Sequence, residues 1–338
     1  MPPLLEVNNL HTSFKTRDGV VHAVNGVSFS VQKGRVLALL GESGSGKSVT
    51  LRTIMRLLPK RTTTAVGEVK FNGEDLLNLS EQDFDVYRGR RISMVFQEPT
   101  AALDPVFTIG QQLGETIRRH NPGIPKRAVD ERSLELLRMV QIPTPERRLH
   151  AYPHEMSGGM KQRAMIAVAL ASRPDLLFAD EPTTALDVTV QAQVLHLMRS
   201  LQNQLDMAMV LVTHDIGVVA EIADDVAVMY AGRIVEFGPV QTVLKQPVHP
   251  YTEGLIKATV KRGQRGTRLY VIPGQPPNLL RLPAGCAFAA RCPYASAACV
   301  EAVPDAVAVS SNHMARCIIA AERAAETRTP PTRERVAS

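Results

Sequence analysis

One short stretch near the start of the chain restricts the possible fold more than any other. Residues 41–48 have the sequence GESGSGKS, which fits the pattern G-x-x-x-x-G-K-[ST] of a phosphate-binding loop. The apolar run at residues 36–40 is typical of a buried parallel strand, and residues 48–55 have helical spacing of apolar side chains. A strand, this loop and a helix in that order predict an α/β domain that binds a nucleoside triphosphate.

The chemistry of phosphate binding explains the residue types in this loop. Glycines allow backbone N–H groups to turn toward a phosphate, and the start of the next helix adds positive potential. We expect Lys47 to reach the β- and γ-phosphates and the Ser48 hydroxyl to ligate Mg²⁺. The alternative is a glycine-rich turn without a ligand, which the Lys-Ser pair at the required position disfavours. The loop residues predicted to contact the nucleotide are Gly41, Ser43, Gly44, Gly46, Lys47 and Ser48.

Two carboxylates follow an apolar run at residues 176–179, where another parallel strand is predicted. A carboxylate at the end of such a strand can hold Mg²⁺, and we assign this role to Asp180. Glu181 is then placed to orient or deprotonate the water that attacks the γ-phosphate. The alternative is an acidic turn after a core strand, which is disfavoured in a chain that also has a phosphate-binding loop.

A second helix start that could face a phosphate precedes this strand. Ser157 is a good N-cap residue, and Gly158 and Gly159 leave the first N–H groups of the helix open to an anion. The alternative is an ordinary Ser-capped helix with a flexible glycine pair.

Length and composition limit how these motifs are interpreted. The 338 residues allow one large α/β domain with a smaller one, and 44% hydrophobic residues are normal for a globular core. No run approaches the ~18 apolar residues of a membrane-spanning helix, and the N-terminus has no basic-then-apolar signal pattern. The net charge of +6, the absence of Trp and the aromatic content of 4% do not indicate a nucleic-acid surface. We expect a cytosolic chain whose membrane attachment goes through a partner.

Periodicity and composition predict three regions. Residues 1–240 form a nucleotide-binding domain, in which residues from about 105 to 172 form a helical subdomain. Residues 241–320, which we term the C-terminal module, are rich in Pro and Gly and contain every cysteine of the chain. The polar stretch 321–338 is predicted to be a disordered tail. The expected strands lie at residues 4–10, 24–31, 36–40, 67–71, 91–96, 176–179, 208–212, 225–230 and 233–237.

With these motifs in this order, residues 1–240 closely resemble the ATP-binding-cassette superfamily. The resemblance implies a P-loop ATPase fold with a RecA-like parallel sheet core, an antiparallel β subdomain and a helical subdomain. It also implies that Ser157, Gly158 and Gly159 belong to the family signature and face the ATP held by a second cassette in a head-to-tail dimer. The element has the sequence MSGGM here, where the commoner family form has Leu and Gln at the ends.

Further positions match motifs of the same family. Gln97 matches the Q-loop, which contacts Mg²⁺ and relays the nucleotide state to a transmembrane subunit. Asp187, at the end of an Ala-Leu-Asp segment, matches the D-loop at the dimer interface, and His214 matches the switch histidine at the γ-phosphate. Phe14 lies where these cassettes place an aromatic ring, more often Tyr, against adenine. The resemblance implies ATP and Mg²⁺ as cofactors, with Glu181, His214 and Gln97 as catalytic residues.

Other stretches resemble the dipeptide/oligopeptide importer branch of this superfamily. They are TTALDVTVQAQ at residues 183–193, QPVHPYT at 246–252 and GQPPNL at 274–279. The same branch carries a C-terminal module of the form LPAGCAF, at residues 282–288, followed by RCP at 291–293. With these segments the resemblance covers nearly the whole chain.

The cysteines have the spacing C-x₅-C-x₆-C-x₁₇-C at Cys286, Cys292, Cys299 and Cys317. Clustered cysteines in a cytosolic protein favour a metal or cluster site over disulfides. Structural zinc sites usually have C-x₂₋₄-C pairs, whereas looser spacing suits a cubane cluster, and members of this branch can hold a [4Fe–4S] cluster. We predict a [4Fe–4S] cluster, with zinc or four reduced thiols packed as small apolar groups as alternatives, and a structural role for the module.

The resemblance implies an importer. Two cassettes, the second a related but different subunit, close on ATP and act on two transmembrane permease subunits, while an external solute-binding protein delivers the solute. The chain is then peripheral, on the cytoplasmic face of the membrane, with no nucleic-acid partner. Peptides are the expected solute, and nickel chelates or glutathione are alternatives. A non-transport ATPase of this superfamily is less favoured because the chain has no long coiled-coil insertion and no second tandem cassette.

Overall fold

The structure is a computed structural model, and it describes residues 2–184, 186–259 and 270–328. An eight-stranded sheet with the order β11-β12-β10-β9-β3-β8-β7-β6 forms its centre. The strands from β9 to β6 in this order are parallel neighbours, whereas β10, β12 and β11 continue the sheet in antiparallel pairs. The strands are β3 (Val36–Leu40), β6 (Ile92–Val95), β7 (Leu176–Asp180), β8 (Ala208–Thr213), β9 (Asp225–Tyr230), β10 (Arg233–Pro239), β11 (Val307–Ser310) and β12 (His313–Ala315).

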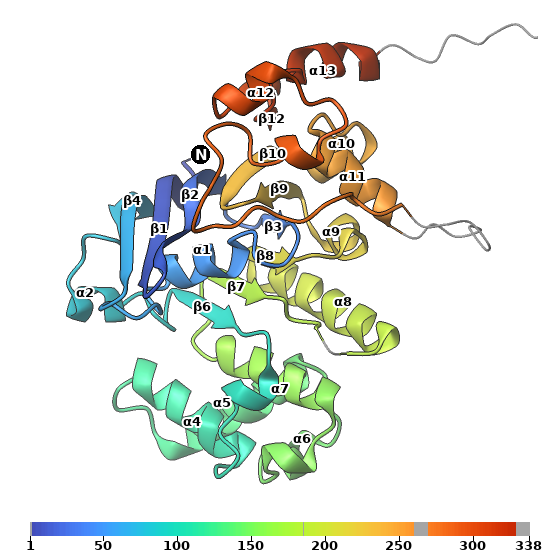
Figure 1. Ribbon diagram of the computed structural model, residues 1–338. Coiled ribbons are helices and arrows are strands. Elements are labelled where there is room, and N and C mark those ends of the chain that lie inside the picture. The colour runs from blue at the N-terminus through green and yellow to red at the C-terminus, as the bar shows by residue number, and fades with distance from the viewer. Residues whose placement is uncertain (1, 185, 260–269, 329–338) are drawn as a thin grey trace, which may run out of the picture.

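Successive residues of the parallel strands face two different hydrophobic cores. Leu177 of β7 packs in one core with α7 (Gly158–Ala169) and α8 (Val188–Leu205). The next residue, Phe178, packs in the other core with α1 (Lys47–Ile54) and the second sheet. Both faces of the parallel strands are therefore covered, which is why every residue of β3 and β7 is buried and why their sequences are apolar up to Asp180, the last residue of β7. The sheet lies as a middle layer between these elements (Figure 1).

A four-stranded antiparallel sheet with the order β2-β1-β4-β5 forms the N-terminal subdomain. Its long strands are joined by a two-residue turn, since Thr16 pairs with Gly19, and Gly19 has a φ angle of +132°. The register shifts around Asn9, which has a φ angle of +48°, so that β1 bends over α1. The strands are β1 (Leu5–Thr16), β2 (Gly19–Val31), β4 (Thr63–Phe71) and β5 (Glu74–Asp75), followed by the short helix α2 (Glu81–Asp85).

The helices between β6 and β7 form a separate group at one end of the molecule (Figure 1). Thr108 begins α4 with a capping box, in which its hydroxyl accepts from Gln111 and the Gln111 side chain accepts from Thr108. Leu113 and Ile117 of α4 pack with Leu136 and Leu137 of α5 in the core that also contains α7. The helices of this group before α7 are α3 (Pro99–Ala102), α4 (Ile109–His120), α5 (Lys126–Met139), α6 (Pro145–Arg148) and the 3₁₀ turn η1 (Pro153–Glu155).

The C-terminal module is attached to the edge of the central sheet. Its strand β12 pairs with β10, where Glu236 lies opposite Ala315. The helix α13 (Ala320–Arg328) occupies the first part of the stretch that we expected to be a disordered tail, because Ala320 and Ala324 are buried against Val248. The other helices after β8 are α9 (Ile216–Ile222), α10 (Val240–Lys245), α11 (Pro250–Ala258), η2 (Ala289–Arg291) and α12 (Ala297–Glu301).

Within residues 2–184, 186–259 and 270–328, no helix has the length and apolar character needed to cross a bilayer.

Candidate functional site

The loop between β3 and α1 has the backbone geometry that a phosphate-binding loop requires. Gly44 and Gly46 have φ angles of +78° and +100°, which L side chains rarely adopt. Gly41 is also confined to glycine, because a Cβ atom there would lie 2.2 Å from the carbonyl oxygen of Met229. The helix α1 begins at Lys47, within the last residues of the loop, so the positive end of its dipole lies at the loop.

The side chain of Lys47 is held inside this loop. Its Nζ donates to the carbonyl oxygens of Gly41, at 2.8 Å, and Glu42, at 2.9 Å. Burial lowers the pKa of Lys47, while the nearby carboxylates of Glu181 and Asp180 act in the opposite direction. The ammonium group therefore lies among oxygen acceptors that a phosphate can replace.

The end of β7 lies against the start of α1. Asp180 is fully buried, and its Oδ1 accepts a hydrogen bond of 2.5 Å from Ser48 Oγ. Arg52, one helical turn after Ser48, donates to Asp180 Oδ2 at 3.3 Å. A hydroxyl and a carboxylate are hard oxygen donors of the kind that Mg²⁺ prefers, and this ion usually completes its shell with water and phosphate oxygens. The donor set thus fits the predicted Mg²⁺ site.

Polar side chains from separate segments contact the carboxylate of Glu181. Its carboxylate accepts from Thr184 Oγ1 at 2.9 Å and from Gln97 Nε2 at 3.3 Å, and it lies 3.4 Å from His214 Nδ1. Its φ angle of +47° is uncommon for a non-glycine residue, and such conformations gather at functional sites. A base, an amide and an imidazole are thereby placed together beside the P-loop.

A cavity of about 520 Å³ joins the P-loop to this polar cluster. Its apolar side includes Phe14 and Val21, which lie opposite each other in the β1–β2 pair. The cavity therefore has an apolar end and a polar end, as a nucleotide requires. The lining residues are Phe14, Val21, Ala23, Ser43, Gly44, Ser45, Gly46, Lys47, Ser48, Val49, Gln97, Glu181, His214 and Leu279.

The sequence matches two protein families. Residues 24–184 match the family described as ABC transporter, and residues 235–299 match the family described as oligopeptide/dipeptide transporter, C-terminal region. The "Dipeptide transport ATP-binding protein DppD" of Lactococcus lactis subsp. cremoris is 49% identical over 313 residues, which cover 93% of this chain and 90% of that protein. The protein of the same name in Bacillus subtilis is 47% identical over 325 residues, which cover 96% of this chain and 97% of that protein.

This chain belongs to the ABC transporter family. Within that family it belongs to the dipeptide/oligopeptide importer branch. Among solved structures, the dimeric post-hydrolysis state of the ATP-binding cassette MJ0796 bound to ADP and Pi is 28% identical, with a TM-score of 0.63, and the match covers 70% of this chain and 98% of that one. The predicted fold class is therefore confirmed. ABC cassettes bind and hydrolyse ATP, and this ABC protein is an ATPase.

The segment that we predicted to be the family signature, residues 157–159, lies outside the cavity beside the P-loop. Ser157 caps α7 by accepting from the Met160 N–H group, yet neither Ser157 nor the two glycines after it line the cavity. Gly159 packs so closely on α8 that a Cβ atom would lie 2.7 Å from Val190 Cγ1. Asp187 caps α8 by accepting from Val190 N–H at 3.0 Å, and Val190 is the residue of α8 that lies against Gly159. The residue at position 185 of the D-loop lies outside the described ranges.

The prediction of a [4Fe–4S] cluster is wrong. In the described part of the chain, which includes all four cysteines, no group of three or more His, Cys, Asp or Glu side chains is placed to hold a metal ion. The same finding leaves the zinc alternative without a ligand set. The sequence spacing misled us because it does not fix where the side chains point, and the four-cysteine module of the predicted family branch is not supported as a metal site.

The cysteines have instead the properties of packed, reduced thiols. All of them are free and half-buried, and Cys286 and Cys292 pack against the cluster that contains Tyr251 and Phe288. Burial raises the pKa of Cys286 and Cys292, and it raises that of Cys317 to about 11.

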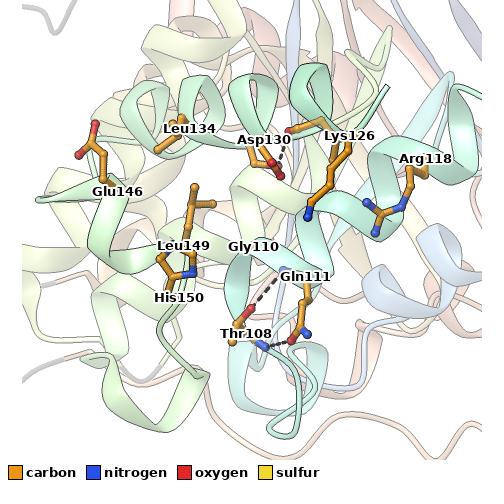
Figure 2. A pocket seen from close by; sticks show the side chains of 12 residues that line it. Thr108, Gly110, Gln111, Arg118, Lys126, Asp130, Leu134, Glu146, Leu149 and His150 are labelled. Atoms are coloured by element: carbon orange, nitrogen blue, oxygen red, sulfur yellow. Dashed lines mark hydrogen bonds between the residues drawn. The ribbon is translucent and has the colours of Figure 1, made fainter. Parts of the chain in front are cut away.

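A second cavity of about 540 Å³ lies among α4, α5 and α6 of the helical subdomain. Figure 2 shows this cavity with the capping hydrogen bonds between Thr108 and Gln111 at its edge. Its lining residues include Lys126, Asp130 and His150, but none from the P-loop or the cluster around Glu181. This cavity is therefore separate from the nucleotide site.

Several residues at the nucleotide site were missed by the sequence interpretation. Arg52 contacts Asp180, and its spacing of one helical turn from Ser48 could have revealed it. Thr184 contacts Glu181 from three residues away in sequence. Leu279 belongs to the GQPPNL segment, but its place at the cavity was not predicted, because it reaches the cavity from the C-terminal module.

Proposed function

We propose that this chain is the ATP-hydrolysing subunit of an importer that takes up peptides across the cytoplasmic membrane. The observation that carries the proposal is similarity along nearly the whole chain to proteins named for peptide transport. These include the two dipeptide transport ATP-binding proteins and a "Putative peptide import ATP-binding protein" of Brucella melitensis, which is 50% identical over 328 residues. The match of residues 235–299 to the oligopeptide/dipeptide C-terminal region supports the same branch.

The P-loop end of the cavity is proposed to bind the triphosphate. Lys47 exchanges its contacts with loop carbonyls for contacts with the β- and γ-phosphates. Ser48 and Asp180 would hold Mg²⁺, with Gln97 as a further oxygen donor, and the ion would neutralise charge on the phosphates. Phe14 offers its ring to the adenine base.

The polar cluster is proposed to act on the attacking water. Glu181 orients the water and accepts its proton, which is the usual role of a carboxylate at the γ-phosphate. His214, which lies 3.4 Å from Glu181, hydrogen-bonds the γ-phosphate and keeps the water in line. Gln97 donates a hydrogen bond to the same carboxylate of Glu181, which couples the Q-loop to the group that activates the water.

A second cassette is proposed to complete the site. Ser157, Gly158 and Gly159 do not line the cavity of their own chain, so their N–H groups and the Ser157 hydroxyl are available to ATP on a partner. The structural relative bound to ADP and Pi is a dimer. The partner is proposed to be a related but different subunit, as in the family branch that the sequence resembles.

The surface beyond the Q-loop is proposed to contact the membrane permeases. Gln97 lines both the nucleotide cavity and a groove of about 530 Å³ that includes Phe96. Ala102 lines both that groove and a second groove of about 760 Å³, which is also lined by Phe107 and Arg119. Exposed aromatic residues beside a groove favour a protein partner. The chain is thus proposed to be peripheral, on the cytoplasmic face of the membrane, and served by an external solute-binding protein.

Reconstitution tests the proposal directly. The chain, its partner cassette, both permeases and the binding protein are placed in proteoliposomes, and uptake of labelled dipeptides and oligopeptides is measured with ATP inside. We expect peptide-dependent stimulation of ATP hydrolysis, which the Glu181→Gln variant abolishes. Stimulation by a nickel chelate or glutathione without any response to peptides would contradict the peptide assignment.

A further inference from the structure

The C-terminal module reaches across the molecule to Glu42, the second residue of the P-loop. Arg291 forms a two-pronged ion pair with it, with Nη1–Oε2 and Nη2–Oε1 distances of 2.8 and 3.0 Å. Arg291 is only 7% exposed, and its Nε donates to the carbonyl oxygen of Pro273 while Nη1 donates to Tyr230 Oη. The hydrogen bonds to Glu42 raise the pKa of Arg291, so the guanidinium stays charged.

The backbone of Glu42 is held by the same module. Its N–H group donates to Tyr251 Oη at 2.8 Å, and Tyr251 is fully buried. Burial raises the pKa of Tyr251, which keeps the phenol neutral. Tyr251 and Arg291 pack together with Tyr230 and Phe288, so both contacts to Glu42 come from one rigid aromatic cluster.

A third contact lies at the apolar end of the cavity. The carbonyl oxygen of Leu279 accepts from the N–H group of His22 at 3.1 Å, which fixes the module beside β2. His22 directly follows Val21, and Val21 lies opposite Phe14 in the strand pair. Leu279, Val21 and Phe14 all line the cavity. Leu279 therefore lies at the end where the ring of Phe14 is available to a nucleobase.

We propose that the C-terminal module is part of the ATP site: Arg291 and Tyr251 position the P-loop through Glu42, and Leu279 contacts the nucleobase. We had expected only a structural role for the module. A free carboxylate in a phosphate-binding loop repels the triphosphate, and pairing with Arg291 offsets that charge. The inference rests on ATP binding at this loop and does not depend on which solute is transported.

Two probes separate the base contact from the phosphate contacts. Binding of ATP and of inorganic tripolyphosphate to the full chain is measured by titration calorimetry with Mg²⁺. Leu279→Ala should weaken ATP binding about threefold to tenfold, because apolar contact with the base is lost, and leave tripolyphosphate binding unchanged. Equal effects on both ligands, or no effect on ATP, would overturn the assignment of Leu279.

Arg291→Gln should weaken both ligands, by about tenfold, because it leaves the carboxylate of Glu42 unpaired in the phosphate-binding loop. The matched control is Arg323→Gln, which removes another largely buried arginine of the C-terminal region whose carboxylate partner, Glu253, lies outside the P-loop. Adding Glu42→Gln to Arg291→Gln removes the unpaired carboxylate and should recover most of the affinity. A purely structural role for Arg291 predicts no such recovery.

The remaining outcomes are also decisive. If Arg291→Gln binds ATP as tightly as Arg323→Gln, or if Glu42→Gln gives no recovery in a variant that keeps the wild-type circular dichroism and melting temperature, the positioning role is wrong. If the wild-type chain binds neither ATP nor tripolyphosphate, the assignment of ATP to this loop fails instead. The two failures are therefore distinguishable.

Discussion

At the residue scale, Glu181 is the group whose chemistry is tested most simply. Its carboxylate is held by Thr184, Gln97 and His214, so the amide of a Glu181→Gln variant fits the same space. We expect ATP turnover to fall by about 10²-fold or more, since an amide cannot accept the proton of the attacking water. The affinity for ATP should stay within about twofold of wild type. Phosphate release and equilibrium ATP binding check the two expectations separately.

The control for this variant is a glutamate far from the cavity. Glu131 lies on α5, pairs with Arg127 and is exposed, so Glu131→Gln should leave both turnover and binding unchanged. Wild-type turnover in Glu181→Gln would show that a different group activates the water.

Asp180 carries a second prediction, which concerns the metal. Its carboxylate is buried between Ser48 and Arg52, where it would share Mg²⁺ with the Ser48 hydroxyl. In Asp180→Asn we expect ATP binding in EDTA to be unchanged or stronger, because a negative charge near the phosphates is removed. The gain in ATP affinity that Mg²⁺ gives the wild type should be lost. A variant that keeps the full Mg²⁺ effect would place the ion on other ligands.

At the element scale, the start of α11 contains a titratable cap. His249 is buried, and its ring atom Nδ1 accepts from the backbone N–H group of Tyr251. The backbone N–H group of His249 donates to the carboxylate of Glu236, which also contacts the ring of His313. Burial lowers the pKa of His249 to about 4, against the opposing effect of Glu236, while Arg323 adds to the lowering. Between pH 6.5 and about pH 4, His249 therefore binds a proton in the unfolded chain but stays neutral in the folded chain.

The stabilising contribution of a neutral His249 is therefore present above pH 6.5 and lost as the pH falls toward 4. Linkage puts the loss at up to about 3 kcal/mol. Asparagine at this N-cap keeps a side-chain acceptor and does not titrate. We expect the free energy of unfolding to fall more between pH 7 and pH 5 in the wild type than in His249→Asn, with Glu236 and His313 intact in both. Equal losses in denaturant titrations would exclude His249 as the source.

Element positions followed from the sequence where local chemistry decides them. The continuous apolar runs of β3 and β7 and the P-loop between β3 and α1 were predicted because their residues are adjacent in the chain. The buried face of α5 is less evident from the sequence, since a polar residue, Ser133, is buried there beside Val129, Leu136 and Leu137. Ser133 can be buried because its hydroxyl donates a hydrogen bond to the Val129 carbonyl oxygen. The spacing of apolar residues cannot reveal such a hydrogen bond.

At the scale of the whole molecule, the sequence did not predict contacts between distant segments. Arg291 and Glu42 are separated by more than two hundred residues, and the sequence around neither residue predicts that they form an ion pair. The cysteines show the converse error, because clustering in sequence suggested a shared metal that the arrangement of the side chains does not support. Order along the chain identified the ABC family, but the role of the C-terminal module needed the three-dimensional arrangement.

The last prediction also belongs to this scale, because the signature segment and the nucleotide cavity of one chain are separate. Ser157 does not line its own cavity, and Val188 at the start of α8 is 84% exposed, as expected for a surface that meets a second cassette. At high concentration a second copy of this chain can take the place of the related partner cassette, so turnover per chain should be low in dilute solution and rise with protein concentration. ATPase assays over a hundredfold range of concentration check this.

Ser157→Arg separates assembly from nucleotide binding. The isolated variant should bind ATP as the wild type does, since Ser157 lies outside the cavity, yet it should lose the rise in turnover because the arginine blocks the partner's phosphates. Mixing it with Lys47→Ala leaves one intact site in each mixed dimer, so part of the activity should return. Turnover per chain that is independent of concentration and unchanged by Ser157→Arg would mean that one chain completes the site alone.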